Sequence, residues 1–152
     1  MRENTRVEGT GVALRHVEER DLLTFYEHQR DPVATEMVDF VARDLEEHLA
    51  HWHRILADAR VRAQTVVEGG AVVGNVLSFD WHDEREIGYW IGREFWGQGI
   101  ASKAVATFLR LEFERPLYGR VAKSNLASLR VLERCGFAVD GEVDGKLSLV
   151  LR

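Results

Sequence analysis

A strand, a glycine-rich turn and a helix follow one another between Glu86 and Ala106, and this succession constrains the fold more than any other feature. Residues 87–91 read IGYWI, an apolar run typical of a buried strand, and apolar residues return at helical spacing after the turn. Gly97 and Gly99 form the turn, where the missing Cβ atoms let a ligand approach the backbone. Free N–H groups at residues 98–102 would lie at the positive end of the helix dipole. The stretch predicts either a phosphate-binding turn or a sharp turn with a purely structural role.

Two common phosphate-binding motifs do not fit this turn. A P-loop requires Lys and Ser or Thr where this chain has Gln98 and Gly99. A dinucleotide motif requires a third glycine at the position of Ser102 and an acidic residue about 20 positions further on. The chain has Tyr118, Gly119 and Arg120 near that second position. Walker-type nucleotide hydrolysis and dinucleotide binding are therefore not expected.

The length and composition predict one soluble domain over residues 1–152. A chain of 152 residues is long enough to bury a core and is the usual size of one domain. We expect a cytoplasmic protein without a membrane partner, because the sequence has neither a long apolar run nor the apolar segment of a signal peptide. The single Cys135 is expected to be a buried small side chain.

Charge and histidine spacing argue against two further classes of site. The net charge is −5, and the first fifty residues hold twelve acids against six arginines. No basic face for nucleic acid is indicated, whereas an acidic first third suits a cationic substrate or simply a solvated surface. His48, His51 and His53 lie on one expected helix but do not share one face, so we expect no metal site.

The pattern along the chain predicts a strand, two helices and three antiparallel strands, followed by a helix, a strand, a helix and two strands. Strands are expected at 12–17, 64–67, 72–79, 87–91, 117–122, 137–139 and 146–151, and helices at 18–30, 44–60, 100–115 and 126–135. Residues 31–43 are expected to form a loop or a short helix, and the polar segment 80–85 a loop. Ser124 and Asn125 precede the last helix as capping residues, and Gly136 is expected to end it.

Two segments together resemble one superfamily. EIGYWIG…WGQGIASKA (86–104) and NLASLRVLERCGF (125–137) are similar to motifs of the GNAT superfamily of acetyl-CoA-dependent N-acetyltransferases, most of all to its RimJ/RimL-type branch. The resemblance covers nearly the whole chain. It implies an α/β (α+β) fold with a mixed, mostly antiparallel sheet of six to seven strands, about four flanking helices and a splayed central strand pair. It also implies acetyl-CoA as co-substrate, with no metal.

The resemblance places the coenzyme along the strand and the turn. The superfamily's motif of Arg or Gln, two residues, Gly, one residue, and Gly or Ala falls on Trp96, Gly99 and Ala101. Trp96 replaces the basic residue, as in RimJ/RimL-type members, and the backbone N–H groups would still hold the pyrophosphate. Lys103 or Arg93 is expected either to approach a coenzyme phosphate or to be a solvated charge. The implied coenzyme-binding residues are Ile91, Gly92, Trp96, Gly97, Gln98, Gly99, Ile100, Ala101, Ser102, Lys103 and Asn125.

In the superfamily the pantetheine arm fills the splay as if it were another strand. By resemblance it would pair with the backbone of Trp90 and Gly92, and the Trp90 N–H would face the thioester oxygen. Such a donor stabilises the oxyanion of the tetrahedral intermediate. Asn125 would contact the pantetheine, or would serve only as the helix N-cap. The side chains of Tyr89 and Trp90 are expected in the core.

The acid and base of the implied reaction are less strongly indicated. Many members carry a tyrosine that protonates the leaving thiolate, but this chain has Leu132 at that position, so Ser128 or a water molecule is the expected substitute. Glu86 opens the central strand and is the first choice as base, since a partly buried carboxylate gains basicity. Weaker candidates lie in the preceding loop: Asp80, His82 and Asp83.

The leading hypothesis is direct transfer of an acetyl group from acetyl-CoA to a primary amine, without a covalent enzyme intermediate. The acceptor would be a protein N-terminal α-amine or a small amine, and the protein a monomer or homodimer with no nucleic-acid partner. Two alternatives remain at this point. One is a non-catalytic domain that binds or senses acyl-CoA, and the other is a structural dimer module with a ligand-free glycine turn.

Overall fold

The computed structural model describes residues 6–8, 11–38 and 40–152, which form a mixed sheet of eight strands with five α-helices. The strand order is β1-β2-β3-β4-β5-β6-β8-β7, and among these described strands only β5 and β6 run parallel to each other. The strands are β1 (Val7–Glu8), β2 (Ala13–His16), β3 (Arg62–Glu68), β4 (Ala71–Trp81), β5 (Glu84–Ile91), β6 (Leu117–Ala122), β7 (Ala138–Val143) and β8 (Lys146–Leu151).

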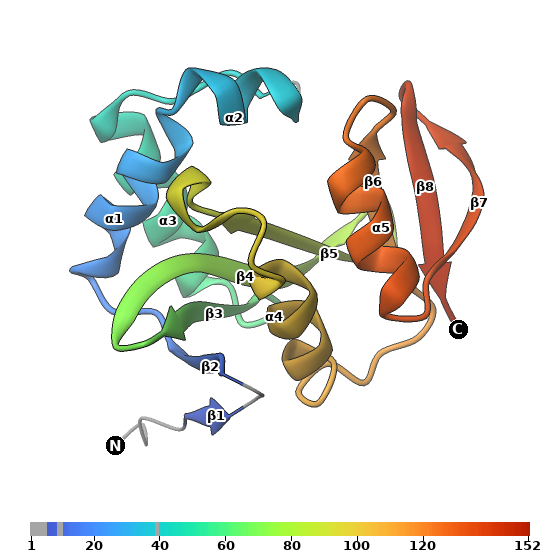
Figure 1. Ribbon diagram of the computed structural model, residues 1–152, viewed down its shortest axis with the longest axis horizontal. Coiled ribbons are helices and arrows are strands. Elements are labelled where there is room, and N and C mark those ends of the chain that lie inside the picture. Colours follow the sequence, from blue (N-terminus) through green and yellow to red (C-terminus); the bar gives the residue numbers. More distant parts are fainter. Residues whose placement is uncertain (1–5, 9–10, 39) are drawn as a thin grey trace.

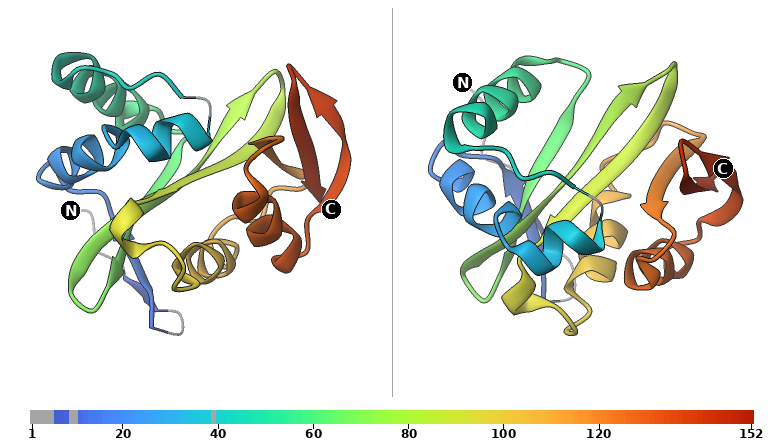
Figure 2. Two further views of the ribbon diagram at one scale, coloured as in Figure 1. Left: turned by 45° about the horizontal axis from the view of Figure 1, so that its top comes forward. Right: turned by 90° about the horizontal axis from the view of Figure 1, so that it is seen from above.

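The helices cover both faces of this sheet. Helices α1 (Asp21–Gln29), α2 (Pro32–Met37) and α3 (Leu45–Ala57) lie on one face, and α4 (Ile100–Phe108) and α5 (Leu126–Arg134) lie on the other (Figures 1 and 2). Each face has its own apolar core. The smaller core contains Leu22, Phe25 and Trp52, and the larger one contains sheet residues together with Phe108 and Leu132. Burial of these side chains from water is the main force that holds the layers together.

Local sequence signals explain where α2 and α3 begin. Asp31 caps α2 by accepting hydrogen bonds from the N–H groups of Val33 and Ala34, and Pro32 occupies the first helical turn. Asp44 and Glu47 form a capping box at the start of α3. The segment 31–43, expected as a loop or short helix, therefore contains a short helix.

Two predicted boundaries are wrong. The segment 80–85 is not a loop, because β4 and β5 continue through it and turn at His82 and Asp83, both with positive φ. The helix after the glycine turn ends at Phe108 rather than near residue 115. Tighter turns follow up to Glu112, whose side chain is buried and accepts a hydrogen bond from the Ser78 hydroxyl on β4.

The predicted fold class is confirmed. The described sheet has eight strands, one more than the upper limit of the six to seven that were predicted. The added strand is the two-residue β1, and the added helix is α2. The last predicted strands are confirmed as the antiparallel pair β7 and β8, although β7 extends to Val143. Gly136 has φ +96° directly after α5, as expected for a glycine that ends a helix.

Candidate active site

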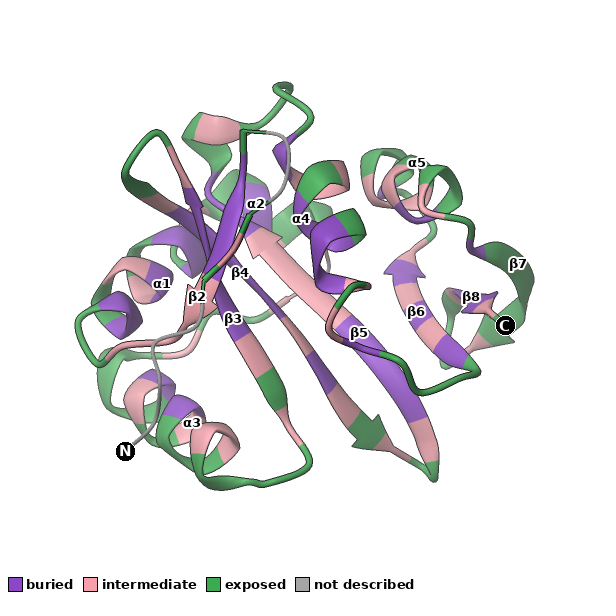
Figure 3. Cartoon of the chain, turned by 90° about the horizontal axis from the view of Figure 1, so that it is seen from below, coloured by how far each residue is buried: buried purple, intermediate pink, exposed green. Residues whose placement is uncertain are grey.

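The parallel strands β5 and β6 separate in the middle of the sheet. They pair only from Arg85 to Ile87 on β5 and from Leu117 to Gly119 on β6. Beyond these residues both strands continue without pairing to each other, and Figure 3 shows them diverging. The expected splay of the central strand pair is therefore present. It leaves an edge of unpaired backbone groups inside the sheet, and such an edge can pair with an extended ligand.

The hydrogen-bond pattern determines which groups of β5 face the splay. The Gly92 N–H donates to the Val73 carbonyl over 2.9 Å, and the Gly92 carbonyl accepts from the Phe95 N–H. At the other end of the ladder, the two-residue turn pairs Trp81 with Glu84. Because partners alternate along an antiparallel ladder, every second residue from Glu84 to Gly92 directs its backbone toward β4.

Trp90 is one of the residues whose backbone points toward β4. The predicted pairing of Trp90 and Gly92 with the pantetheine, and the predicted Trp90 N–H at the thioester, therefore do not fit this geometry. Tyr89 and Ile91 direct their backbone groups away from β4 instead. The Ile91 carbonyl accepts a hydrogen bond of 2.8 Å from the Trp96 indole, which confirms its direction.

The glycine turn joins β5 to α4 through a short 3₁₀ helix, η1 (Arg93–Phe95). Gly97 and Gly99 have φ values of +78° and +74°, and a Cβ at either position would meet nothing within 4 Å. Glycine is required there for its conformation, and the space in front of the turn is open. Among the residues that the structure describes, no side chain caps α4, so N–H groups of its first turn can bind an anion.

The side chains around this turn have different surroundings. Gln98 and Lys103 are exposed, Ala101 and Ser102 are half-buried, and Ile100 belongs to the core. Trp96 is 36% exposed, and its indole fixes the turn to β5 through the bond to Ile91. Arg93 is exposed and pairs with Asp31 at 3.4 Å. Of the two predicted cations, Lys103 is thus the one on the first turn of α4.

The start of α5 forms the opposite wall of the splay. Asn125 is 8% exposed and accepts a hydrogen bond from the Ser128 N–H, so it is the N-cap of the helix. The Ser128 hydroxyl forms a hydrogen bond with the Tyr89 hydroxyl from β5. Leu132 is 1% exposed and packs on Gly119, where a Cβ would lie 2.7 Å from its side chain. The site usually occupied by a tyrosine is thus solid core in this protein.

Sequence reasoning missed Tyr89, which was expected only as a core residue. Its phenol crosses from β5 to α5 and is hydrogen-bonded there. The sequence indicated only the face on which Tyr89 lies, because side chains alternate along a strand and Tyr89 therefore shares a face of β5 with Ile87. The contact with Ser128 depends on how α5 packs, which the pattern does not reveal.

Glu86 lies on the other face of β5 and is 9% exposed. Burial raises the pKa of its carboxyl group, and the guanidinium of Arg120, 3.6 Å away, only partly opposes this effect. Trp90 shares this face by alternation and stacks edge-on against Phe40, which follows α2. Glu86 therefore faces the side of the sheet that α1 and α2 cover.

Arg120 is a second residue that sequence reasoning missed. It donates to Glu84 over 2.7 Å and to the Ser148 hydroxyl over 3.2 Å, and its guanidinium lies over the ring of Tyr118. These contacts hold the cation beside Glu86 although its side chain is only 8% exposed. The cation limits how far burial can raise the pKa of Glu86.

The weaker base candidates lie at the far end of the β4–β5 hairpin. Hydrogen bonds from Arg60 hold the pKa of Asp80 at about 2, which leaves this carboxylate ionised and a poor base. His82 and Asp83 are exposed residues of the turn itself. None of the three lies next to the splay, whereas Glu86 lies in the paired segment of β5 directly before it.

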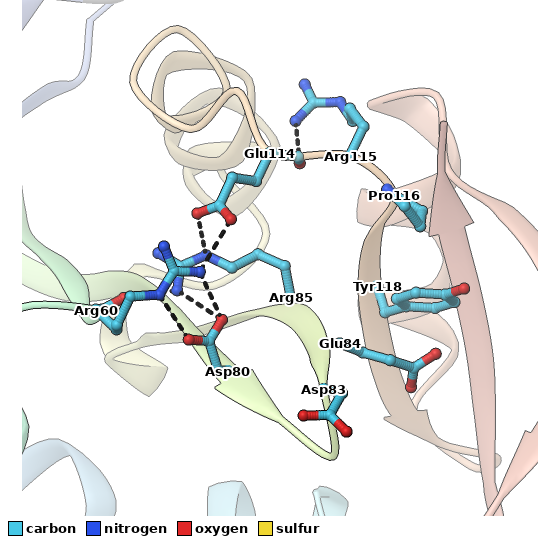
Figure 4. A pocket seen from close by; sticks show the side chains of 9 residues that line it. All are labelled: Arg60, Asp80, Asp83, Glu84, Arg85, Glu114, Arg115, Pro116 and Tyr118. Atoms are coloured by element: carbon cyan, nitrogen blue, oxygen red, sulfur yellow. Dashed lines mark hydrogen bonds and ion pairs between the residues drawn. The ribbon is translucent and has the colours of Figure 1, made fainter.

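A polar cavity of about 230 Å³ lies at that same far end of the hairpin (Figure 4). Its lining residues are Arg60, Asp80, Asp83, Glu84, Arg85, Glu114, Arg115, Pro116 and Tyr118. Arg85 is 7% exposed and is bonded to Glu112, Ser78 and the Arg60 carbonyl. Because these side chains are bonded to one another, we interpret the cavity as part of a structural ion-pair network rather than a reaction site.

The histidines and the cysteine have structural contacts. His48 is bonded to the Leu22 carbonyl over 2.8 Å, and His53 is bonded to Glu19. Cys135 is half-buried against the larger core, and burial raises the pKa of its thiol, which disfavours the nucleophilic thiolate. Within the described ranges, no helix is long and apolar enough to cross a membrane.

The splayed strands, the glycine turn and the start of α4 form one continuous arrangement in this fold. Residues 12–138 match the family described as acetyltransferase (GNAT) domain. This match covers most of the chain, and the protein therefore belongs to the GNAT acetyltransferase domain family.

One curated relative is YdaF of Bacillus subtilis, which is named as a candidate ribosomal N-acetyltransferase. It is 31% identical over 104 residues, an alignment that covers 64% of this chain and 57% of YdaF. The chain thus spans little more than half the length of this relative.

Solved structures share the fold at lower identity. The aminoglycoside acetyltransferase AAC(6')-Ib in complex with coenzyme A has a TM-score of 0.79 and 23% identity, over 92% of this chain and 94% of that one. Mycobacterium smegmatis RimJ in complex with CoA-disulfide has a TM-score of 0.74 and 22% identity, over 97% and 86%.

Proposed function

We propose that this GNAT domain transfers an acetyl group from acetyl-CoA directly to a primary amine. The observation that carries the proposal is the open edge of β5 beyond Ile87, which leads straight to the free N–H groups at the start of α4. An extended arm with a phosphate at one end and a reactive group at the other fits this arrangement. Acetyl-CoA has that construction.

The coenzyme would lie along the splay with its pyrophosphate on the glycine turn. Its arm would pair with the backbone of Tyr89 and Ile91, since the backbone of Gly92 is already bonded within the chain. Lys103, on the first turn of α4, would approach a phosphate, and the Asn125 amide would border the arm. The residues proposed to hold the coenzyme are Tyr89, Ile91, Trp96, Gly97, Gln98, Gly99, Ile100, Ala101, Ser102, Lys103 and Asn125.

The two faces of β5 would supply different parts of the reaction. Glu86, on the face of α1 and α2, would take a proton from the acceptor amine, directly or through water, so that the neutral nitrogen attacks the thioester carbon. An N–H of Tyr89 or Ile91 would donate to the oxyanion, and removal of comparable donors costs about 3 kcal/mol. The C–S bond then breaks, and Ser128 lies on the side of the departing sulfur.

We favour a protein N-terminal α-amine as the acceptor, within a RimJ/RimL-like branch. The likeness to YdaF and the Trp at position 96 support this choice. A small amine is the second candidate, because an aminoglycoside acetyltransferase shares the fold.

A thiol-release assay with acetyl-CoA tests the proposal. The panel contains short peptides with free N-termini, the same peptides with blocked N-termini, a polyamine and an aminoglycoside. We expect release with at least one free amine, and free peptides alone would support the RimJ/RimL-like assignment. Tight acetyl-CoA binding without release from any amine would contradict transfer and indicate a binding or sensing domain.

We further propose that residues 1–152 act as one domain in the cytoplasm, as a monomer or homodimer, without a nucleic-acid or membrane partner. The acidic net charge of −5 supports the absence of a nucleic-acid partner. Size-exclusion chromatography with light scattering distinguishes the monomer from the homodimer.

A further inference from the structure

A row of polar side chains crosses the sheet on the face that α1 and α2 cover. Thr65 on β3, Asn75 on β4 and Trp90 on β5 are paired in register, so their side chains lie side by side on one face. The Thr65 hydroxyl donates a hydrogen bond of 2.8 Å to Asp21 of α1, which identifies this face. Glu86 shares the face by alternation along β5. The row therefore lies on the side of the sheet from which the acceptor amine would approach.

Two members of this row lack a hydrogen-bond partner. The indole Nε1 of Trp90 is buried and has no partner among the residues that the structure describes. Asn75 is 6% exposed, and within the same described ranges its amide forms no hydrogen bond either. A buried polar group without a partner destabilises the folded chain, so native proteins usually satisfy such a group with water or a ligand.

A third unpartnered group lies beside them on α1. His28 is 8% exposed, and its Nδ1 has no partner in the described part of the chain. Its ring lies against Gly92, the second residue after Trp90, where a Cβ would be only 2.7 Å from the ring. Burial lowers the pKa of His28, although Glu27 and Glu94 oppose this effect, so the ring is neutral at neutral pH. The three groups therefore offer hydrogen bonds but no charge.

A neutral group that both accepts and donates hydrogen bonds matches this set. The indole of Trp90 can only donate, whereas the amide of Asn75 can also accept. A peptide group presents a carbonyl oxygen and an N–H in one plane, so it can satisfy both side chains. A second ammonium group of a small polyamine would instead lose its hydration here without gaining a carboxylate.

The spacing along β5 suits an extended acceptor. Gly88 lies between Glu86 and Trp90 on the same face and carries no side chain. A Cβ at Gly88 would meet only Phe79 and Leu77, at 3.6 and 3.9 Å. Four strand residues span about 13 Å, and an extended peptide advances roughly 3.3–3.6 Å per residue. An acceptor whose α-amine lies near Glu86 thus brings one of its first peptide groups toward Trp90.

We propose that Trp90 and Asn75 recognise a peptide group of the acceptor. The indole N–H of Trp90 donates to the carbonyl oxygen of this group, and the amide of Asn75 accepts from its N–H. The inference rests on the proposed function and deepens it, because it selects a peptide N-terminus over a small amine. Both residues determine specificity, since they hold the acceptor while Glu86 takes the proton from its amine.

Thiol release with matched acceptors tests this recognition. The reference acceptor is trialanine amide, and in two analogues a carbon–carbon double bond replaces the first or the second peptide group. The double bond keeps the extended shape but removes the carbonyl oxygen and the N–H. The variants are Trp90→Phe and Asn75→Leu, and Trp81→Phe at the other end of β4 is the matched control. In wild type we expect kcat/KM to fall about tenfold for one of the two analogues, because hydrogen bonds are lost at a buried site.

Both variants should lower kcat/KM for trialanine amide about tenfold and should no longer distinguish it from that analogue, while Trp81→Phe behaves as wild type. Analogues that equal trialanine amide in wild type, or a preference that survives in both variants, overturn the inference alone. Wild type that acetylates a small amine but no peptide also overturns it and leaves acetyl transfer intact. Wild type that releases thiol with no amine overturns the proposed function as well. Circular dichroism checks that each variant folds, and if Trp90→Phe does not, Asn75→Leu decides.

Discussion

Replacement of Glu86 by glutamine should lower the activity of the protein without lowering its stability. Burial raises the pKa of this carboxyl group, so folding works against its ionised form. The folded protein therefore binds the proton more tightly than the unfolded chain, and stability is lost as pH rises through the folded pKa. Glutamine removes this charge, while Arg120 keeps its 2.7 Å bond to Glu84. At neutral pH we expect Glu86→Gln to be at least as stable as wild type in urea unfolding.

The same variant should lose most of its activity. General bases contribute typically about 10² to 10⁴ in rate, so kcat/KM of Glu86→Gln should fall by at least about 100-fold in the thiol-release assay. The acid limb of the wild-type pH profile should report a pKa above the ordinary value of a glutamate and should vanish in the variant. Asp83→Asn on the exposed turn is the matched control and should stay within about twofold. A Glu86→Gln enzyme with nearly wild-type kcat/KM would refute the assignment of the base.

Three further changes probe the turn, the helix cap and the buried network. Gly99→Ala places a side chain at φ +74°, which costs roughly 1–2 kcal/mol of strain. Calorimetry should show weaker binding of acetyl-CoA to this variant. An unchanged affinity would show that the turn does not contribute to coenzyme binding. Asn125→Ala deletes the N-cap of α5 and should lower the free energy of unfolding, measured in urea, by about 1 kcal/mol. An unchanged free energy of unfolding would show that the cap does not stabilise the protein. Arg85→Met leaves Glu112 buried without its partner and should destabilise by about 3–5 kcal/mol. Burial alone would raise the pKa of Glu112, but hydrogen bonds from Ser78 and Arg85 lower it, so wild type should lose stability as pH falls through that depressed pKa; a flat acid profile would argue against this network.

Local patterns were sufficient for the elements that border the site. The apolar run at 87–91, the paired glycines and the helical spacing after them predicted β5, the turn and α4, because each depends on neighbours in sequence. The resemblance added the splay between β5 and β6, which the structure confirms.

Features that depend on the sheet register were not predictable in the same way. Whether Trp90 or Tyr89 faces the splay depends on the two-residue turn at 82–83, which sets every hydrogen bond along the β4–β5 ladder. The sequence pattern predicted a loop at 80–85, so it did not determine this register. The backbone groups facing the splay were therefore expected at Trp90 and Gly92 instead of Tyr89 and Ile91. Arg120 escaped notice for a related reason, since its contacts join β5, β6 and β8 from distant parts of the chain.

The central claim is that acetyl-CoA occupies the splay and the glycine turn, and thermal unfolding tests it most directly. Acetyl-CoA, ATP and NADPH are compared at equal concentration with the protein alone. A ligand at 100 times its dissociation constant adds about 2.7 kcal/mol, which corresponds to an increase of roughly 5–10 °C in Tm for a chain of this size. We predict that increase with acetyl-CoA alone. Folded protein that shows no shift with acetyl-CoA, or equal shifts with all three ligands, would contradict the claim.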